Sequence, residues 1–319
     1  MTILLTGVTG NIGSEVARQL RGYRVVELAR GDDPVAAKDC EIIIHCAALT
    51  AFRAPWEELH SANVLLTKKL LDFAEACPRL RRFVHISTAC VCGAASGLIH
   101  EAPLPRPSRF VNDYERSKWE AEDLVARSRL PSTIVRLSTA AGGETDGRVL
   151  RPGALHHLLF WLWKGLVPMI PGSAEAKVDL ISTEHAGRLI VAAALARDVP
   201  PVLHACAGLR APALGELLAH LAGEFAGLSA TWRRGSIMPP ELVDGKTFAL
   251  FGETVAQSGD LLFQRVLSDA KYFLPALSFP RIYDTAGADA ICEPAHSDWR
   301  TLVSHVTRYV LHRHIHARA

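Results

Sequence analysis

A tyrosine and a lysine four residues apart carry the most specific chemistry in this sequence. Tyr114 and Lys118 lie in a segment with helical spacing over residues 114–127, so both side chains are expected on one face of a helix. An ammonium close to a phenol stabilises the phenolate and brings its pKa of about 10 toward neutrality. A tyrosine of this kind acts as a general acid or base, so the spacing predicts proton transfer at Tyr114.

Two hydroxyl residues, Ser87 and Thr88, precede this helix and follow an apolar segment expected as a strand over residues 82–86. The Tyr114–Lys118 spacing alone also fits an ordinary amphipathic helix with a surface side-chain pair. The hydroxyl pair and the glycines described next, all in chain order, favour the catalytic interpretation.

Three glycines, Gly7, Gly10 and Gly13, connect an apolar strand expected at residues 3–6 to a helix expected at residues 14–20. Glycines there are typical of ordinary turns and also of dinucleotide sites. In the second case they permit a tight turn, close approach of backbone N–H groups to the pyrophosphate, and close helix packing. The helix N-terminus would stabilise the phosphate charge. The strand and helix on either side favour the dinucleotide site.

The elements around these residues alternate. Further strands are expected at residues 23–29, 41–45, 82–86 and 132–136, with helices at residues 62–76 and 114–127. This alternation predicts an α/β fold with a Rossmann-type, doubly wound parallel sheet. The pattern becomes irregular after residue 150. We therefore expect a cofactor-binding domain over residues 1–150. Residues 151–319 are expected to form mainly a smaller substrate-binding lobe, with some segments returning to the Rossmann core.

The composition narrows the class of protein. The 319 residues are 49% hydrophobic with a net charge of +2, which gives no electrostatic case for nucleic acid. The seven cysteines are scattered without a C-x-x-C pair, which indicates reduced thiols rather than disulfides or a metal site. The chain starts directly with a strand, so we expect a cytoplasmic protein without a signal peptide. Residues 154–170 are too interrupted to span a membrane and predict a buried helix ending at Gly165.

Taken in order, these motifs resemble the extended short-chain dehydrogenase/reductase family over at least residues 1–190. The resemblance implies that Tyr114 exchanges a proton with the substrate oxygen while Lys118 holds the nicotinamide ribose and tunes the tyrosine. Thr88, with Ser87 as the reserve candidate, would bond the substrate carbonyl, and Asn63 would be a structural or proton-relay residue. The remaining cofactor contacts it implies are Thr9, Asn11 and Ile12 in the glycine turn, Ala47 and Ala48 after the third expected strand, and Leu137.

The end of the second expected strand bears on the choice of cofactor. NAD-binding folds usually place an acid there for the ribose 2′-OH, whereas a 2′-phosphate needs a cation. Ala29 occupies that place and Arg30 follows, so we expect NADP(H), with Arg30 on the phosphate. In the alternative, Asp32 or Asp33 binds the ribose. The short segment of residues 31–40 leaves the usual third strand shortened or absent.

Residues 136–147, 164–172 and 178–182 are similar to the fatty acyl-CoA reductase and thioester reductase branch, although Leu137 stands where that branch often has proline. The branch implies NADP(H)-dependent reduction of a carbonyl, thioester or aldehyde on a fairly apolar small molecule, such as an acyl thioester on CoA or a carrier protein. Two alternatives use the same fold. One is a nucleotide-sugar epimerase or dehydratase that retains its cofactor, and the other is a non-catalytic NADP-binding sensor.

Overall fold

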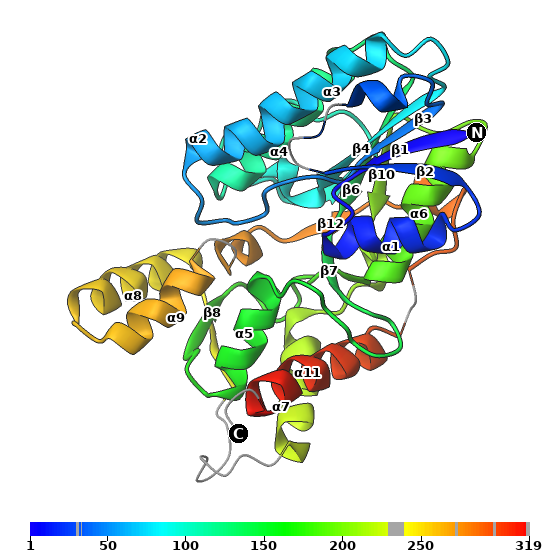
Figure 1. Ribbon diagram of the computed structural model, residues 1–319. Coiled ribbons are helices and arrows are strands. Elements are labelled where there is room, and N and C mark those ends of the chain that lie inside the picture. The colour runs from blue at the N-terminus through cyan, green and yellow to red at the C-terminus, as the bar shows by residue number, and fades with distance from the viewer. Residues whose placement is uncertain (30–31, 33, 229–238, 272–273, 296–297, 317–319) are drawn as a thin grey trace.

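Six parallel strands form the central sheet in the part of the chain that the computed structural model describes, which is every residue except 30–31, 33, 229–238, 272–273, 296–297 and 317–319 (Figure 1). The sheet order is β10-β6-β4-β3-β1-β2, and its strands are β1 Thr2–Thr6, β2 Arg24–Leu28, β3 Ile42–His45, β4 Arg82–Thr88, β6 Ser132–Leu137 and β10 Val202–Ala205. The predicted Rossmann-type parallel sheet is confirmed. Five of its strands lie where the sequence indicated, and β10 was not predicted.

Helices cover both faces of this sheet. Helices α3 (Leu66–Glu75) and α4 (Asp113–Arg127) lie on one face, and α1 (Asn11–Gln19) and α6 (Thr183–Leu195) lie on the other (Figure 1). In β1, Ile3 and Leu5 pack toward α1 and α6 while Leu4 packs toward α3 and α4. Alternate residues of a strand face opposite sides, so a sheet covered on both faces needs continuously apolar strands.

The connection between β2 and β3 is short. Its described residues form one 3₁₀ turn, η1 (Pro34–Ala37), and β2 pairs with β1 alone among the described strands. The expectation of a shortened third unit is therefore confirmed for the described residues. The chain leaves β1 toward β2 on one side and continues at β3 on the other side, so connections diverge at the carboxyl ends of β1 and β3. Open α/β sheets bind their ligands at such a switch point.

The second half of the chain builds a helical lobe below the sheet in Figure 1. Its helices are α5 Ala154–Trp163, α7 Leu214–Gly227, α8 Gly245–Gln257, α9 Leu261–Ala270 and α11 Trp299–His316, and the short strands β8 Met169–Pro171 and β11 Glu241–Val243 pair beside them. The apolar segment predicted as a buried helix is α5. Its Leu159, Leu162 and Trp163 are buried in the core of this lobe. Within the described residues, no helix has the length and apolar character required to cross a bilayer.

Several segments from beyond residue 150 join the Rossmann half. Besides β10 in the main sheet, β9 (Leu180–Ser182) pairs with β7 (Thr139–Gly142), and β12 (Arg281–Tyr283) pairs with β5 (Gly97–Ile99). The two halves of the chain are thus interleaved by strand pairing rather than joined by a single linker.

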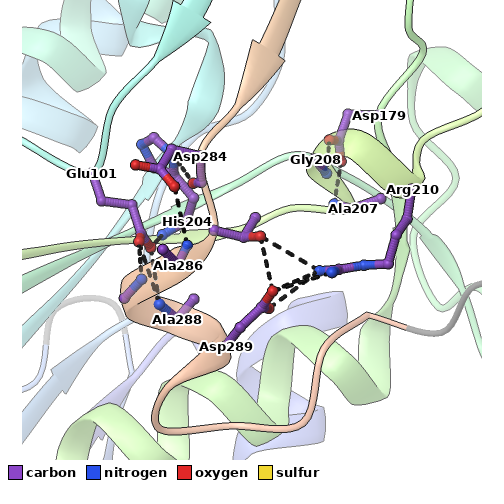
Figure 2. A network of polar contacts seen from close by, with 12 residues as sticks. Glu101, Asp179, His204, Ala207, Gly208, Arg210, Asp284, Ala286, Ala288 and Asp289 are labelled. Atoms are coloured by element: carbon purple, nitrogen blue, oxygen red, sulfur yellow. Dashed lines mark hydrogen bonds and ion pairs between the residues drawn. The ribbon is translucent and has the colours of Figure 1, made fainter.

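A polar network fixes the segment that follows β12 against the sheet (Figure 2). The Glu101 carboxylate accepts hydrogen bonds from the backbone nitrogens of His204 (2.7 Å) in β10 and Ala288 (3.2 Å) in α10 (Ala286–Asp289). Arg210 forms an ion pair with Asp289 at 3.1 Å. One carboxylate therefore ties together the edge strand, the short helix and the loop that follows β5.

Candidate active site

The glycine turn has no room for side chains at two of its three glycines. Gly7 has a φ of +77°, and a Cβ there would lie 2.6 Å from the Ala47 nitrogen. A Cβ at Gly13 would lie 2.1 Å from the Gly7 oxygen. At Gly10, which caps α1 and donates its N–H to the Gly7 oxygen (3.0 Å), a Cβ would meet that oxygen alone within 4 Å, at 3.3 Å. The turn therefore offers bare backbone at the start of α1, which fits the phosphate cradle expected from the sequence.

The other predicted cofactor residues lie in this turn, in the loop after β3 and at the end of β6. The Ala47 nitrogen donates to Thr6 Oγ1 (3.1 Å), and Ala48 follows it, so the loop after β3 lies against Gly7. Ile12 packs partly buried on the sheet. Leu137, at the end of β6, pairs with Thr88 and is 8% exposed.

Arg30 lies outside the described residues, as do Gly31 and Asp33. Strand β2 ends at Leu28, and no acid stands at its tip. The carboxylate of Asp32 accepts a hydrogen bond from the Ala29 nitrogen at 2.8 Å. Asp32 is thus engaged in the turn after β2.

Tyr114 lies in the first turn of α4, next to the end of β4. The helix begins after Asn112, whose side chain accepts a hydrogen bond from the Glu115 nitrogen (2.9 Å) and so fixes the first turn. Tyr114 is half-buried as a residue, its phenol interacts with the Thr88 hydroxyl, and the Phe52 ring lies 5.2 Å from the Tyr114 ring. The structure therefore brings together the tyrosine and one of the two predicted hydroxyls.

Ser87, the reserve hydroxyl, is 4% exposed and has no hydrogen-bond partner within the described chain. Thr88 is the last residue of β4, and its Oγ1 accepts from the Cys90 nitrogen at 3.2 Å. The Thr88 hydroxyl also bonds the Tyr114 phenol, whereas the Ser87 hydroxyl makes no such contact. The geometry favours Thr88.

Lys118 is buried one helical turn behind Tyr114. Its Nζ donates to the Ile86 oxygen (2.7 Å) and lies 3.5 Å from His85 Nε2. Burial lowers the pKa of Lys118 to about 8, and the charge of Glu122 opposes this shift. The ammonium is thus held against the carboxyl end of β4.

The expected lowering of the tyrosine pKa is not observed. Burial raises the pKa of Tyr114 above its usual value, and charge on Cys90 and Glu115 acts in the same direction. Lys118 shares the helix face but directs its Nζ toward the backbone of β4. Helical spacing placed both residues correctly but could not show the direction of a long, flexible side chain.

Asn63 lies in a π-helical turn, η2 (His60–Leu65), between α2 (Trp56–Leu59) and α3. Its Oδ1 accepts from the Leu49 nitrogen (2.7 Å), and its Nδ2 donates to the Leu49 oxygen (3.1 Å) and to Ser117 Oγ (2.8 Å). Both amide hydrogens are therefore engaged. Asn63 ties the loop after β3 to the helix that carries Tyr114.

Two buried histidines near Lys118 were not recognised from the sequence. His45 and His85 are paired in register on β3 and β4, with ring centroids 5.5 Å apart. His45 contacts Thr6 Oγ1 (2.8 Å) and Thr67 Oγ1 (3.1 Å), and burial lowers the pKa of His45 to about 3. The signal available in the sequence was one histidine in each of two otherwise apolar strands.

Thr9 and Asn11 meet a residue that the sequence did not connect with the site. The Arg151 guanidinium donates to Thr9 Oγ1 at 3.2 Å, and the Asn11 side chain bonds the Arg151 backbone. Nothing in the spacing of the sequence relates residues so far apart.

Residues 27–190 match the model of a family described as male sterility protein, an NAD-binding branch of the extended short-chain dehydrogenases/reductases, and the match covers about half of the chain. The chain belongs to this family. The male sterility match begins after the glycine turn, so the turn geometry is evidence independent of it.

Two curated relatives of this chain are reductases. A ketoreductase of Stigmatella aurantiaca, named for a farnesyl dihydroquinoline oxide, is 38% identical over 99 residues, which are 30% of this chain and 29% of the relative. An alcohol-forming fatty acyl-CoA reductase of Simmondsia chinensis is 36% identical over 66 residues, which are 21% of this chain and 13% of the relative. The chain thus spans less than a third of each relative.

Several solved structures share the fold of this chain. The terminal R domain of the myxalamid PKS-NRPS pathway has a TM-score of 0.78 at 20% identity, covering 98% of this chain and 91% of that one. A UDP-glucuronic acid 4-epimerase of Bacillus cereus in complex with NAD scores 0.68 at 18% identity, covering 98% and 99%. An archaeal thiolation-reductase di-domain scores 0.68 at 17% identity, covering 98% and 76%.

Proposed function

We propose that this protein is an NADP(H)-dependent reductase that acts on a carbonyl, thioester or aldehyde group of a fairly apolar small molecule. The observation that carries the proposal is the meeting of the Tyr114 phenol and the Thr88 hydroxyl beside a buried Lys118. These groups lie at the carboxyl end of β4, on the same edge of the sheet as the glycine turn.

In this reaction Thr88 donates a hydrogen bond to the substrate oxygen, and Tyr114 transfers its proton to that oxygen. The phenol of Tyr114 is protonated at neutral pH, as a proton donor must be, and burial raises its pKa further. NADPH, when bound, supplies the hydride. Lys118 would bind the cofactor ribose, while Asn63 keeps the helix of Tyr114 in place.

A thioester substrate gains a hydrogen on carbon and a proton on oxygen, which gives a hemithioacetal. The C–S bond then breaks, and an aldehyde and a free thiol leave. We propose an acyl thioester carried by CoA or by a carrier protein, because the relatives include a fatty acyl-CoA reductase and the structural neighbours include a thiolation-reductase di-domain.

We assign cofactor binding mainly to residues 1–150 and substrate binding mainly to residues 151–319, with the returning strands completing the sheet. NADP(H) is favoured over NAD(H) because β2 ends without an acid and Arg30 follows it in the sequence. A cytoplasmic location fits the seven free thiols.

The test is oxidation of NADPH against a panel of acyl-CoA, acyl-carrier, ketone and aldehyde substrates, with a homologous series of chain lengths. Turnover of a thioester, aldehyde or ketone, lost in Tyr114→Phe, supports the proposal. An absence of net NADPH oxidation with every member of the panel contradicts it.

A nucleotide-sugar epimerase is the second candidate, since one structural neighbour is a UDP-glucuronic acid 4-epimerase with a TM-score of 0.68. An epimerase regenerates its cofactor and shows no net consumption. Turnover of UDP-glucuronic acid with cofactor retained through purification would favour this candidate. Cofactor binding without any chemistry would instead favour a sensor.

A further inference from the structure

Arg151, from the loop between β7 and α5, lies against the glycine turn although more than a hundred residues separate the two in sequence. Its Nη2 donates to Thr9 Oγ1 at 3.2 Å. Its backbone is held as well, because the Asn11 side chain donates to the Arg151 oxygen (2.9 Å) and accepts from the Arg151 nitrogen (2.8 Å). Asn11, the first residue of α1, thus bonds both the backbone N–H and the backbone C=O of Arg151.

The charge of Arg151 is placed where a cation is unfavourable unless an anion is present. The N-terminus of a helix carries a partial positive charge, and α1 has no acidic residue in its first turn. In the described part of the chain, the Arg151 guanidinium has no carboxylate partner, and its hydrogen bond to Thr9 uses one of five N–H donors. Arg151 itself is exposed. Arg151 is therefore bonded to the residues on either side of Gly10, at the positive end of α1.

We propose that Arg151 is a phosphate-binding residue of the cofactor site and that it contacts the pyrophosphate, with Asn11 as its positioning residue. This inference rests on the proposed function, since it assumes that the turn holds a dinucleotide. The contact is with the pyrophosphate and not with the 2′-phosphate, because Arg151 is anchored at the N-terminus of α1, whereas the 2′-phosphate belongs at the end of β2.

The assignment also gives the second half of the chain a role at the cofactor. A guanidinium that bridges the glycine turn and the loop of residues 143–153 couples cofactor binding to the segment that leads into α5. The bond to Thr9 holds the side chain of Arg151, and the two bonds to Asn11 hold its main chain, before any ligand arrives, which reduces the entropy lost on binding.

Direct binding measurements test the proposal without turnover. Dissociation constants for NADPH, NADH and ADP-ribose are compared for the unmodified protein, Arg151→Ala and Arg148→Ala. Arg148 is the matched control, since it removes one charge from the same loop. We expect Arg151→Ala to weaken all three ligands by the same factor, about tenfold to a hundredfold. Arg148→Ala is expected to change binding by less than about twofold.

Asn11→Ala tests the positioning residue, because it removes both bonds to the Arg151 backbone while leaving the charge. We expect a smaller loss, again equal for the three ligands, with a small decrease in melting temperature from the two lost hydrogen bonds. Equal affinities for the unmodified protein and Arg151→Ala would overturn the inference. So would a loss confined to NADPH, which would assign Arg151 to the 2′-phosphate. If the unmodified protein binds none of the three, the proposed function itself fails.

Discussion

Tyr114 and Lys118 share one helix face but meet different surroundings. The tyrosine is partly exposed beside Thr88, whereas the lysine is 2% exposed and bonded to the backbone of β4. Burial moves the two pKa values in opposite senses, because it disfavours the charged form of each group. The phenol therefore stays protonated at neutral pH, while the lysine is held against the β4 backbone.

Tyr114→Phe removes the proton donor and keeps the ring that contacts Phe52. We expect kcat to fall by at least ~10², the usual scale for general acid–base catalysis, while the NADPH dissociation constant stays nearly unchanged. Steady-state kinetics on the best substrate of the panel, together with fluorescence titration of NADPH, measure both quantities. Unchanged turnover in the variant would remove Tyr114 from the mechanism.

Arg30→Ala is expected to separate the two cofactors. A guanidinium on the 2′-phosphate contributes ~1.5–3 kcal/mol through a charge-assisted bond, so NADPH affinity should fall by roughly tenfold to a hundredfold. NADH lacks that phosphate and should bind as before. Titration of both cofactors measures the difference, and an equal loss for the two would show that Arg30 is not the selector.

At the scale of elements, the start of α1 depends on the close approach of Gly13 to the backbone of Gly7. Gly13→Ala places a Cβ 2.1 Å from the Gly7 oxygen, which is a backbone atom that cannot yield without moving the turn. We expect a loss of ~1–3 kcal/mol in the free energy of unfolding, as for other overpacked sites. Urea denaturation measures it.

Gly223→Ala in α7 is the matched control for this prediction, because nothing lies within 4 Å of a Cβ there. This variant should be more stable by ~0.5–1 kcal/mol, the usual preference for alanine within a helix. A Gly13→Ala protein as stable as this control would mean that the turn adapts and that the close packing is not needed.

Local patterns predicted much of the Rossmann half. The apolar strands β1, β3, β4 and β6 were found because a sheet buried on both faces requires runs such as Ile42–His45. Tyr114 was singled out by its helical spacing to Lys118, and Thr88 was chosen over Ser87 by the family resemblance. The short connection after β2 was also visible in the sequence.

Pairings between distant segments could not be predicted. Strands β5 and β12 have three residues each, and neither has a sequence pattern that predicts which strand it pairs with. Arg151 reaches the glycine turn through bonds to its main chain, which any residue type could offer. The raised pKa of Tyr114 depends on burial by several elements at once. Such features arise from tertiary packing and leave no local periodicity.

At the scale of the whole molecule, one buried carboxyl makes stability depend on pH. Glu115 is 2% exposed, and burial raises its pKa from 4.5 to about 7. The unfolded state therefore releases this proton at lower pH than the folded state does. Its contribution to stability is fully present below about pH 4.5 and falls as the pH rises through 7.

Glu115→Gln should remove this dependence. Between pH 5 and pH 7.5 we expect the unmodified protein to lose up to about 3 kcal/mol of unfolding free energy relative to the variant. Neutral buried histidines change stability in the same range but do so equally in both proteins, so the difference isolates Glu115. Urea denaturation at the two pH values provides the measurement, and parallel pH profiles would contradict the assignment.

Because strands from the two halves of the chain pair with each other, the central sheet cannot be completed until β10 has been synthesised. The outer neighbour of β6 lies at Val202–Ala205, and β5 needs the strand at Arg281–Tyr283. A nascent chain therefore carries the glycine turn and α4 for some time while the outer edge of β6 remains unpaired. Unpaired strand edges are prone to aggregation, so chaperones that hold nascent chains would have a defined binding edge in this interval.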